Sequence, residues 1–203
     1  MRKTAIIAAF TACLSLPLSA QESTVLEDGT PVRPDDADKL AMFSTHFTGA
    51  LRVAFAQGQS GDIADLVDSL SGAAMPADDA IEALQGDWKC QTIKAGELSA
   101  LVVYAPFDCR IEGNIFEKST GSQRTRGAIH RDSGRLIYLG TGFVQGSEVP
   151  AYADLPTDPL SSPNPGQIWS DIALVEAVTP NRARLIFPDP ALESQMNVLY
   201  LTR

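Results

Sequence analysis

Two segments, Gly86-Asp87-Trp88-Lys89-Cys90 and Phe107-Asp108-Cys109-Arg110, decide the fold that this sequence predicts. In both, apolar or cysteine residues alternate with charged residues, which is the period-two pattern of a strand with one buried face. Each cysteine lies on the apolar face of its strand. A Cys90–Cys109 disulfide would close a loop of about 20 residues and contribute roughly 3 kcal/mol by restricting the unfolded chain.

The cysteine pair could instead be reactive or bind a metal ion. Either alternative would favour a Cys-x-x-Cys spacing or histidines close by in the sequence, and neither is present, since the two histidines are His46 and His130. We therefore expect a structural disulfide. The sequence also has no catalytic-triad pattern, no Gly-x-Ser-x-Gly nucleophile motif and no phosphate-binding loop, so it identifies no reaction, catalytic residue, metal site or cofactor.

From Gly86 onward the hydrophobic period changes from helical to two, and turn residues interrupt the chain at short intervals. Pro106 splits the second predicted strand and indicates a bend or a sheet edge there. Consecutive strands without intervening helices predict an up-and-down barrel or a strongly coiled antiparallel sheet, because closure removes exposed strand edges. The eight predicted strands cover residues 86–94, 100–104 with an extension through 107–111, 114–118, 123–130, 135–144, 168–177, 182–187 and 195–202.

Two amphipathic helices are predicted before the strands, over residues 34–58 and 60–71. Their apolar residues recur at helical spacing, and Phe55 and Val67 are among those expected to face inward. A further helical turn over residues 78–84 is only weakly indicated. The predicted fold class is α+β, with two N-terminal helices packed on an antiparallel barrel or coiled sheet of about eight strands.

Residues 1–20 have the composition of a secretory signal peptide, with two basic residues, an apolar run and a Ser19-Ala20 ending suited to signal peptidase. The apolar run is shorter than the roughly 20 residues of a membrane-spanning helix. We therefore expect cleavage near Ala20, a periplasmic or secreted protein and no stable membrane insertion. Residues 21–34 are expected to form a flexible tail. Residues 35–203 are expected to form one domain, with a helical lead-in over 35–85 and a barrel-like sheet over 86–203.

The chain carries 16 Lys and Arg residues against 25 Asp and Glu residues, a formal net charge of −9. Binding to a nucleic-acid backbone depends on Lys and Arg displacing counterions, so nucleic acid is not an expected partner. Basic residues nevertheless gather around the fourth predicted strand, where Arg124 and Arg126 are two positions apart and share a face. If that face lines a barrel interior, the guanidinium groups could bind a carboxylate or phosphate; if it faces water, they form a solvated surface.

Several runs together resemble a known protein family: residues 86–94 (GDWKCQTIK), 101–104 (LVVY), 107–111 (FDCRI) and 116–124 (FEKSTGSQR). They resemble the bacterial secreted proteins of domain-of-unknown-function family 4893. The resemblance covers most of the chain after the predicted signal. It implies export and a shared fold, but it supplies no activity and no catalytic residue.

The Gly86-x-Trp88 motif, preceded by a helical turn, is similar to the opening of calycin barrels such as lipocalins. This similarity implies a calycin-like barrel in which Trp88 closes one end, covered by a basic side chain from a late strand. Arg203 is the candidate for that cover.

Two functions are compatible with these features. The first is a non-enzymatic binding module for a small amphipathic or anionic ligand, since an eight-stranded barrel can hold one such molecule. The second is a periplasmic protein-interaction or inhibitor protein that acts on a partner protein through a loop such as residues 151–165, a proline-rich stretch. Enzyme activity is a third and less favoured interpretation. The candidate ligand-binding residues are Arg124, Arg126, Trp88 and Tyr104.

Overall fold

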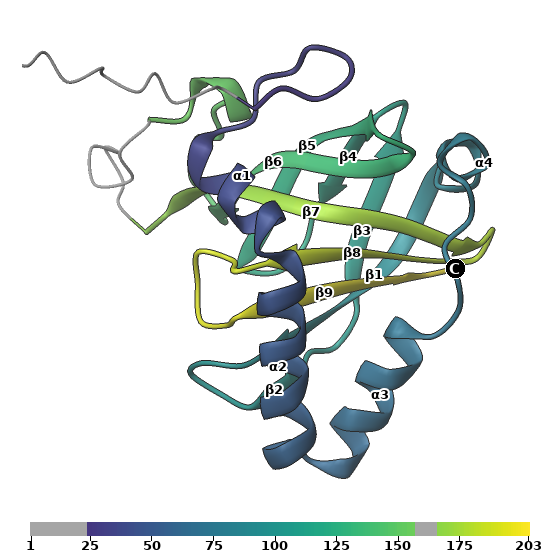
Figure 1. Cartoon of the computed structure of the whole chain (residues 1–203), viewed down its shortest axis with the longest axis vertical. Helices are drawn as coiled ribbons and strands as arrows, with labels where there is room; N and C mark the ends of the chain where they lie inside the picture. The colour runs from purple at the N-terminus through teal and green to yellow at the C-terminus, as the bar shows by residue number, and fades with distance from the viewer. Residues whose placement is uncertain (1–23, 157–165) are drawn as a thin grey trace, which may run out of the picture.

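The computed structural model of the 203-residue chain describes residues 24–156 and 166–203. The predicted signal peptide, residues 1–20, lies outside the described residues. Within them, the chain forms four α-helices, one short 3-10 helix and a single antiparallel sheet. The predicted α+β fold class is therefore confirmed, and Figure 1 shows the helices lying against the outside and one end of the sheet.

The sheet closes into a barrel. Neighbouring strands follow one another in chain order from β3 to β9, and β9 pairs with β1 over Lys89–Ala95, so eight of the nine described strands form a closed ring. All of these pairings are antiparallel. The strands are β1 (Gly86–Ala95), β2 (Leu101–Val103), β3 (Phe107–Glu112), β4 (Ile115–Lys118), β5 (Gln123–Asp132), β6 (Arg135–Val144), β7 (Ile168–Thr179), β8 (Arg182–Pro188) and β9 (Met196–Thr202).

The ninth strand results from the break predicted at Pro106. Both β2 and β3 pair with the same edge of β1, β2 with Ile93–Ala95 and β3 with Gly86–Cys90. Proline has no backbone N–H and cannot continue the ladder, so the chain leaves β1 between the two segments. The same pairing brings together Cys90 and Cys109, which form the predicted disulfide with their Cα atoms 5.9 Å apart.

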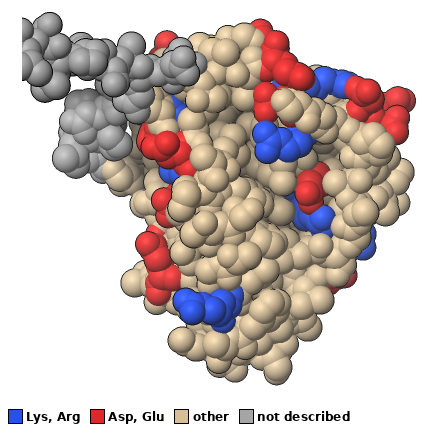
Figure 2. Space-filling view, in the orientation of Figure 1, with Lys and Arg blue, Asp and Glu red and all other residues tan. Residues whose placement is uncertain are grey.

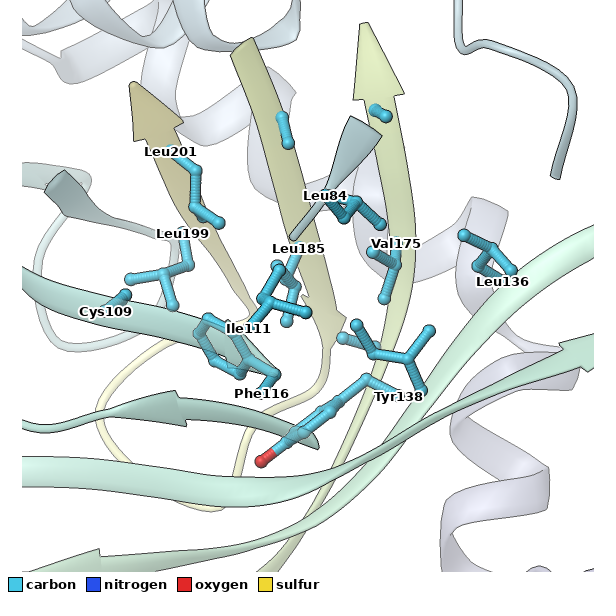
Figure 3. Close-up of a cluster of buried hydrophobic side chains, with 14 of the residues drawn as sticks. Leu84, Cys109, Ile111, Phe116, Leu136, Tyr138, Val175, Leu185, Leu199 and Leu201 are labelled. Carbon is cyan, nitrogen blue, oxygen red and sulfur yellow. The ribbon is translucent and has the colours of Figure 1, made fainter. Parts of the chain in front are cut away.

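The closed end of the barrel holds the main hydrophobic core (Figure 3). The ring of Phe116 meets that of Tyr138 edge-on at 5.6 Å between centroids, and both side chains are completely buried. Trp88 is also buried here, and the guanidinium carbon of Arg203 lies 4.0 Å from its ring centroid. The predicted cover of Trp88 by Arg203 is therefore present. Helix α4 (Ala77–Ala83) and the following Leu84 complete this end.

The remaining helices cover the outside of the sheet. Helix α1 (Pro34–Ala41) lies on β7, whereas α2 (Phe43–Gln57) and α3 (Ser60–Leu70) pack on the outer faces of β1, β2, β8 and β9. The sequence predicted one helix where α1 and α2 stand, and the chain interrupts it at Met42. The interruption has a packing reason, because the two halves contribute to separate hydrophobic clusters. The weakly indicated turn at residues 78–84 forms α4, so the described residues hold more helices than expected.

Two residues predicted to face inward are exposed: the exposed fractions are 50% for Phe55 and 48% for Val67. Each follows a completely buried neighbour, Ala54 or Leu66, and only one of two adjacent helical residues can point directly at the sheet. The described part of the expected flexible tail also packs: Leu26 and Val32 are buried against the outer faces of β6 and β7. Hydrogen bonds across a turn hold this segment, including one from Leu26 N–H to the carbonyl of Thr30.

Candidate functional site

A cavity of about 340 Å³ lies at the end of the barrel opposite Trp88. Antiparallel order explains its walls, because the ends of β1, β4, β6 and β8 and the beginnings of β3, β5, β7 and β9 all meet at this end. The loop between β8 and β9 and Tyr104, between β2 and β3, contribute to its rim. Eight-stranded barrels are wide enough inside to hold one small ligand when side chains leave the space.

The interior changes character along the barrel. At the closed end the inward positions are apolar, but towards the open end the same alternation places polar and charged side chains inside. On β1, for example, Trp88 and Cys90 are followed at period two by Thr92 and Lys94, which line the cavity. On β7, Ala173 is preceded in the same way by Asp171.

Lys118, at the end of β4, is the most unusual basic residue of the cavity. It is only 6% exposed, and its Nζ donates hydrogen bonds to the carbonyl oxygens of Thr120 (2.9 Å) and Gln123 (2.6 Å). Among the residues that the structure describes, no carboxylate lies within ion-pair distance of Lys118. Burial, and then the nearby charges of Arg124 and Lys94, lower the pKa of Lys118 to about 8. The group thus stays mostly protonated at neutral pH.

Lys94 extends the cationic side of the cavity. It is 7% exposed, and its Nζ donates to Gln123 Oε1 at 2.9 Å and to Glu193 Oε2 at 2.6 Å. Glu193 belongs to the β8–β9 loop, and the hydrogen bond from Lys94 lowers the pKa of its carboxyl group. Glu193 is half exposed at the rim, so the Lys94 ion pair lies where a ligand would enter.

Aromatic side chains provide apolar surface between the charged groups. The Nζ atom of Lys118 lies 3.9 Å from the ring centroid of Phe107, a cation–π geometry. Phe187 of β8 and Trp169 of β7 line the cavity further round the barrel, and Tyr104 stands at the rim with 39% of its surface exposed. The cavity therefore combines cations with ring surfaces, as an amphipathic anion requires.

The opposite wall holds a buried acid, Asp171, on β7. Its exposed fraction is 8%, and its Oδ1 accepts a hydrogen bond from Trp169 Nε1 at 3.0 Å. Burial raises the pKa of Asp171 to about 6, an effect that hydrogen bonding with Thr125 and Trp169 only partly offsets. Gly142 of β6 lies against these two side chains, and a Cβ atom there would overlap Trp169 Nε1. The glycine thus permits both groups to lie close to the barrel wall.

The structure places the four predicted ligand-binding residues in different parts of the molecule. Tyr104 and Arg124 line the cavity. Arg126 does not: its side chain is 61% exposed on the outer surface, 3.9 Å from Glu117. Trp88 lies in the core of the opposite end, where its Nε1 donates to the carbonyl of Leu84 at 2.8 Å.

The positions of the two arginines follow from strand alternation. Thr125 points inward, with its hydroxyl 2.7 Å from that of Tyr138, so Arg124 and Arg126 belong to the outer face. Arg124 still reaches the cavity because it lies at the start of β5, directly after Gln123, and its Nε donates to the carbonyl of Gly121 in the preceding turn.

Sequence reasoning missed Lys94 and Asp171, and it placed Lys118 in the basic cluster around the fourth predicted strand without choosing it as a ligand-binding residue. A signal was present, because each continues the inward series of its strand: Lys94 lies two positions after Thr92, Lys118 two after Phe116, and Asp171 two before Ala173. A charged residue on an otherwise apolar strand face is either exposed near a strand end or buried in a functional cavity. Only the closed barrel of the tertiary structure shows which of these two situations applies to each residue.

The loop between β6 and β7, which includes the predicted interaction segment 151–165, is described only through residue 156 and from residue 166. Its first part forms the 3-10 helix η1 (Tyr152–Asp154). The hydroxyl of Tyr152 donates to Asp36 Oδ2 and accepts a hydrogen bond from the backbone N–H of Arg33. These contacts join the described part of the loop to the beginning of α1.

Charge on the visible surface is mixed. On the face shown in Figure 2, Lys and Arg side chains occur in small groups, several of them beside Asp or Glu, and no continuous basic surface appears. None of the helices in the described part of the chain has both the length and the apolar composition needed to span a membrane. The same residues contain no group of three or more His, Cys, Asp or Glu side chains arranged to hold a metal ion.

Comparison with known proteins identifies a family but no characterised relative. Neither a curated protein nor a solved structure matches the chain significantly. A family model described as "Domain of unknown function (DUF4893)" matches residues 30–201, which include the whole barrel, apart from the last residue of β9, and the helices from α1 onward. The resemblance inferred from residues 86–124 is thus confirmed over most of the sequence, and the chain belongs to the DUF4893 family.

Proposed function

We propose that this protein is a non-enzymatic binding module that holds a small amphipathic anion in the cavity at the open end of its barrel. The anionic group of the ligand binds near Lys118, Lys94 and Arg124, and the apolar part contacts Phe107 and Phe187. A volume of about 340 Å³ suits one small molecule. The proposal includes export, as the composition of residues 1–20 predicts, so that the ligand is met in the periplasm or outside the cell.

The observation that carries this proposal is the buried ammonium group of Lys118. Transfer of a charged group into a protein interior is unfavourable unless an opposite charge or several hydrogen bonds compensate. Here two backbone carbonyl oxygens and the face of Phe107 compensate in part, with no carboxylate partner among the described residues. An anionic ligand supplies the missing charge, and the neighbouring Arg124 adds a second cation.

The proposal is tested with two fluorescent probes that share an aromatic body and differ in charge. Anilinonaphthalene sulfonate is anionic, and N-phenylnaphthylamine is its neutral counterpart without the sulfonate. We expect the wild-type protein to bind the sulfonate more tightly. A charge-assisted hydrogen bond contributes about 1.5–3 kcal/mol, so Lys118→Met should weaken sulfonate binding about 10- to 100-fold and leave neutral-probe binding nearly unchanged.

Arg124→Ala and Arg126→Ala form a matched pair, because the two arginines belong to one strand and only Arg124 lines the cavity. Arg124→Ala should weaken sulfonate binding, whereas Arg126→Ala should not. Circular dichroism and thermal unfolding establish that each variant is folded. Equal affinity of the wild type for both probes, or equal effects of the two arginine substitutions, would contradict the proposal.

A further inference from the structure

The two charged walls of the cavity face each other across the barrel. In the closed ring, β7 is three strands from β1 through β8 and β9, and three strands from β4 through β6 and β5. Asp171 on β7 is therefore on the far side of the cavity from Lys94 on β1 and Lys118 on β4, and all three side chains line it. The cavity has a cationic side and a carboxylate side.

Asp171 is poorly compensated for a buried carboxyl group. Trp169 Nε1 donates a hydrogen bond to Oδ1 and Thr125 also contributes hydrogen bonding, but no Lys or Arg of the described ranges 24–156 and 166–203 lies within ion-pair distance. An ionised carboxyl group has about four acceptor positions, so Asp171 can accept further hydrogen bonds from a group in the cavity. Its raised pKa, about 6, still leaves it mostly ionised at neutral pH.

A second buried aspartate of the same protein, Asp36, has its negative charge fully compensated by an ion pair and hydrogen bonds. Asp36, on α1, is completely buried and lies outside the barrel. Its carboxyl oxygens contact Lys39 Nζ at 3.0 Å, the hydroxyl of Tyr152 at 2.9 Å and that of Ser170 at 3.1 Å. Asp36 forms a structural ion pair with Lys39, and the two hydroxyl groups complete the hydrogen bonding of its carboxyl group. Asp171 has fewer partners and borders an open cavity.

We infer that the natural ligand carries, besides its anionic group, a hydrogen-bond donor such as an ammonium or hydroxyl group at its other end, and that Asp171 binds this donor. The inference rests on the proposed function and adds the second polar group of the ligand. The apolar part of such a molecule lies against Phe187, on β8 between the two charged sides, and against Phe107, on β3 at the cationic side. Molecules of this class include ω-amino and ω-hydroxy carboxylic acids.

The test uses three carboxylic acids of one chain length: octanoate, ω-aminooctanoate and ω-hydroxyoctanoate. The hexanoate and decanoate sets are measured in the same way, because the chain must match the width of the cavity. Dissociation constants are obtained by displacement of anilinonaphthalene sulfonate from the full-length protein. In the set that fits, we expect a terminal donor to tighten binding by about tenfold or more.

Three variants identify the residue responsible. Asp171→Asn should abolish the advantage of the terminal donor and leave the affinity for octanoate unchanged. Lys118→Met should weaken all three acids by a similar factor. Glu117→Gln, which alters a carboxylate on the outer surface beside Arg126, should leave the advantage of the terminal donor intact. Folding of each variant is checked by circular dichroism.

The outcomes separate the inference from the function on which it rests. If octanoate binds and requires Lys118, but no terminal donor improves affinity at any chain length, the inference about Asp171 is wrong and the proposed function stands. The same conclusion follows if the advantage of the donor survives Asp171→Asn. If neither the acids nor the sulfonate probe binds the wild-type protein, the proposed function itself fails.

Discussion

Replacement of Asp171 by asparagine should make this protein more stable at neutral pH. Asparagine has nearly the shape of aspartate and keeps an oxygen for the hydrogen bond from Trp169 Nε1, but it carries no charge. The native structure holds the ionised carboxyl group in a buried site where, among the described residues, no basic group lies within ion-pair distance and the charge of Lys39 offsets burial only in part. Removing that charge therefore removes an unfavourable contribution to the free energy of folding.

The magnitude follows from the pKa of Asp171, which burial raises from 3.8 to about 6. The two values differ by about two pKa units, and each unit corresponds to about 1.4 kcal/mol, so ionisation of Asp171 opposes folding by about 3 kcal/mol at neutral pH. A raised carboxyl pKa means that the folded state binds its proton more tightly. The unfavourable contribution is thus absent below about pH 4, grows as the pH rises, and is complete above about pH 6.

Urea unfolding of the wild type and of Asp171→Asn, followed by tryptophan fluorescence or circular dichroism, measures this difference. At about pH 7.5 the variant should have a free energy of unfolding up to about 3 kcal/mol higher, and at about pH 4 the two should agree. The same substitution should abolish preference for a terminal donor in the ligand, as expected when a binding group is retained at a cost in stability.

Asp36→Asn is the matched control, because Asp36 is also buried but is paired with Lys39. Breaking a buried ion pair leaves an uncompensated charge, so this variant should be less stable than the wild type. We therefore expect the two substitutions to change the free energy of unfolding in opposite directions. If Asp171→Asn is neutral or destabilising at about pH 7.5, or if its effect does not change between pH 4 and 7.5, then Asp171 is compensated in the native state and our reasoning is refuted.

Three further predictions concern the other end of the barrel and the predicted signal. Replacing both Cys90 and Cys109 by alanine should lower the free energy of unfolding by roughly 3 kcal/mol in urea, and a loss below about 1 kcal/mol would show that the disulfide restricts the unfolded chain little. Arg203→Ala removes the cation over Trp88 and hydrogen bonds to the carbonyls of Ala83 and Pro180, so it should destabilise the protein by about 1–3 kcal/mol. Binding of anilinonaphthalene sulfonate should persist in the folded Arg203 variant, because the cavity lies at the opposite end; its selective loss would argue against that location. Finally, N-terminal sequencing of protein from a periplasmic fraction should begin at Gln21, and recovery in the cytosol with an intact N-terminus would contradict export.

Much of the fold could be predicted from local features of the sequence. Alternation of apolar and polar residues located the strands, because side chains on a strand point to opposite faces in turn. Pro106 marked the division between β2 and β3, since proline cannot donate to the ladder. The cysteine pair and the Gly86-x-Trp88 motif each involve a few residues with a specific geometry, and the disulfide and the Arg203 cover followed from them.

The helices were less predictable because their limits depend on what they cover. An apolar stripe continues through Met42, but α1 and α2 bury their faces against different parts of the barrel. The exposure of Phe55 has the same origin, since the sheet surface decides which side of a broad stripe is covered. The spacing of apolar residues in the sequence identifies the apolar stripe of a helix, but it does not identify the surface on which that stripe packs.

The candidate site was decided by tertiary structure. Lys94, Lys118 and Asp171 lie on three strands far apart in the sequence, and only the pairing of β1 with β9 closes the ring that brings them around one cavity. The sequence alone determined that an acidic, cysteine-bearing chain forms consecutive strands with alternating faces. Which face becomes the interior, and which end of that interior stays open and charged, depends on barrel closure, because burial of a side chain is a property of all the strands around it.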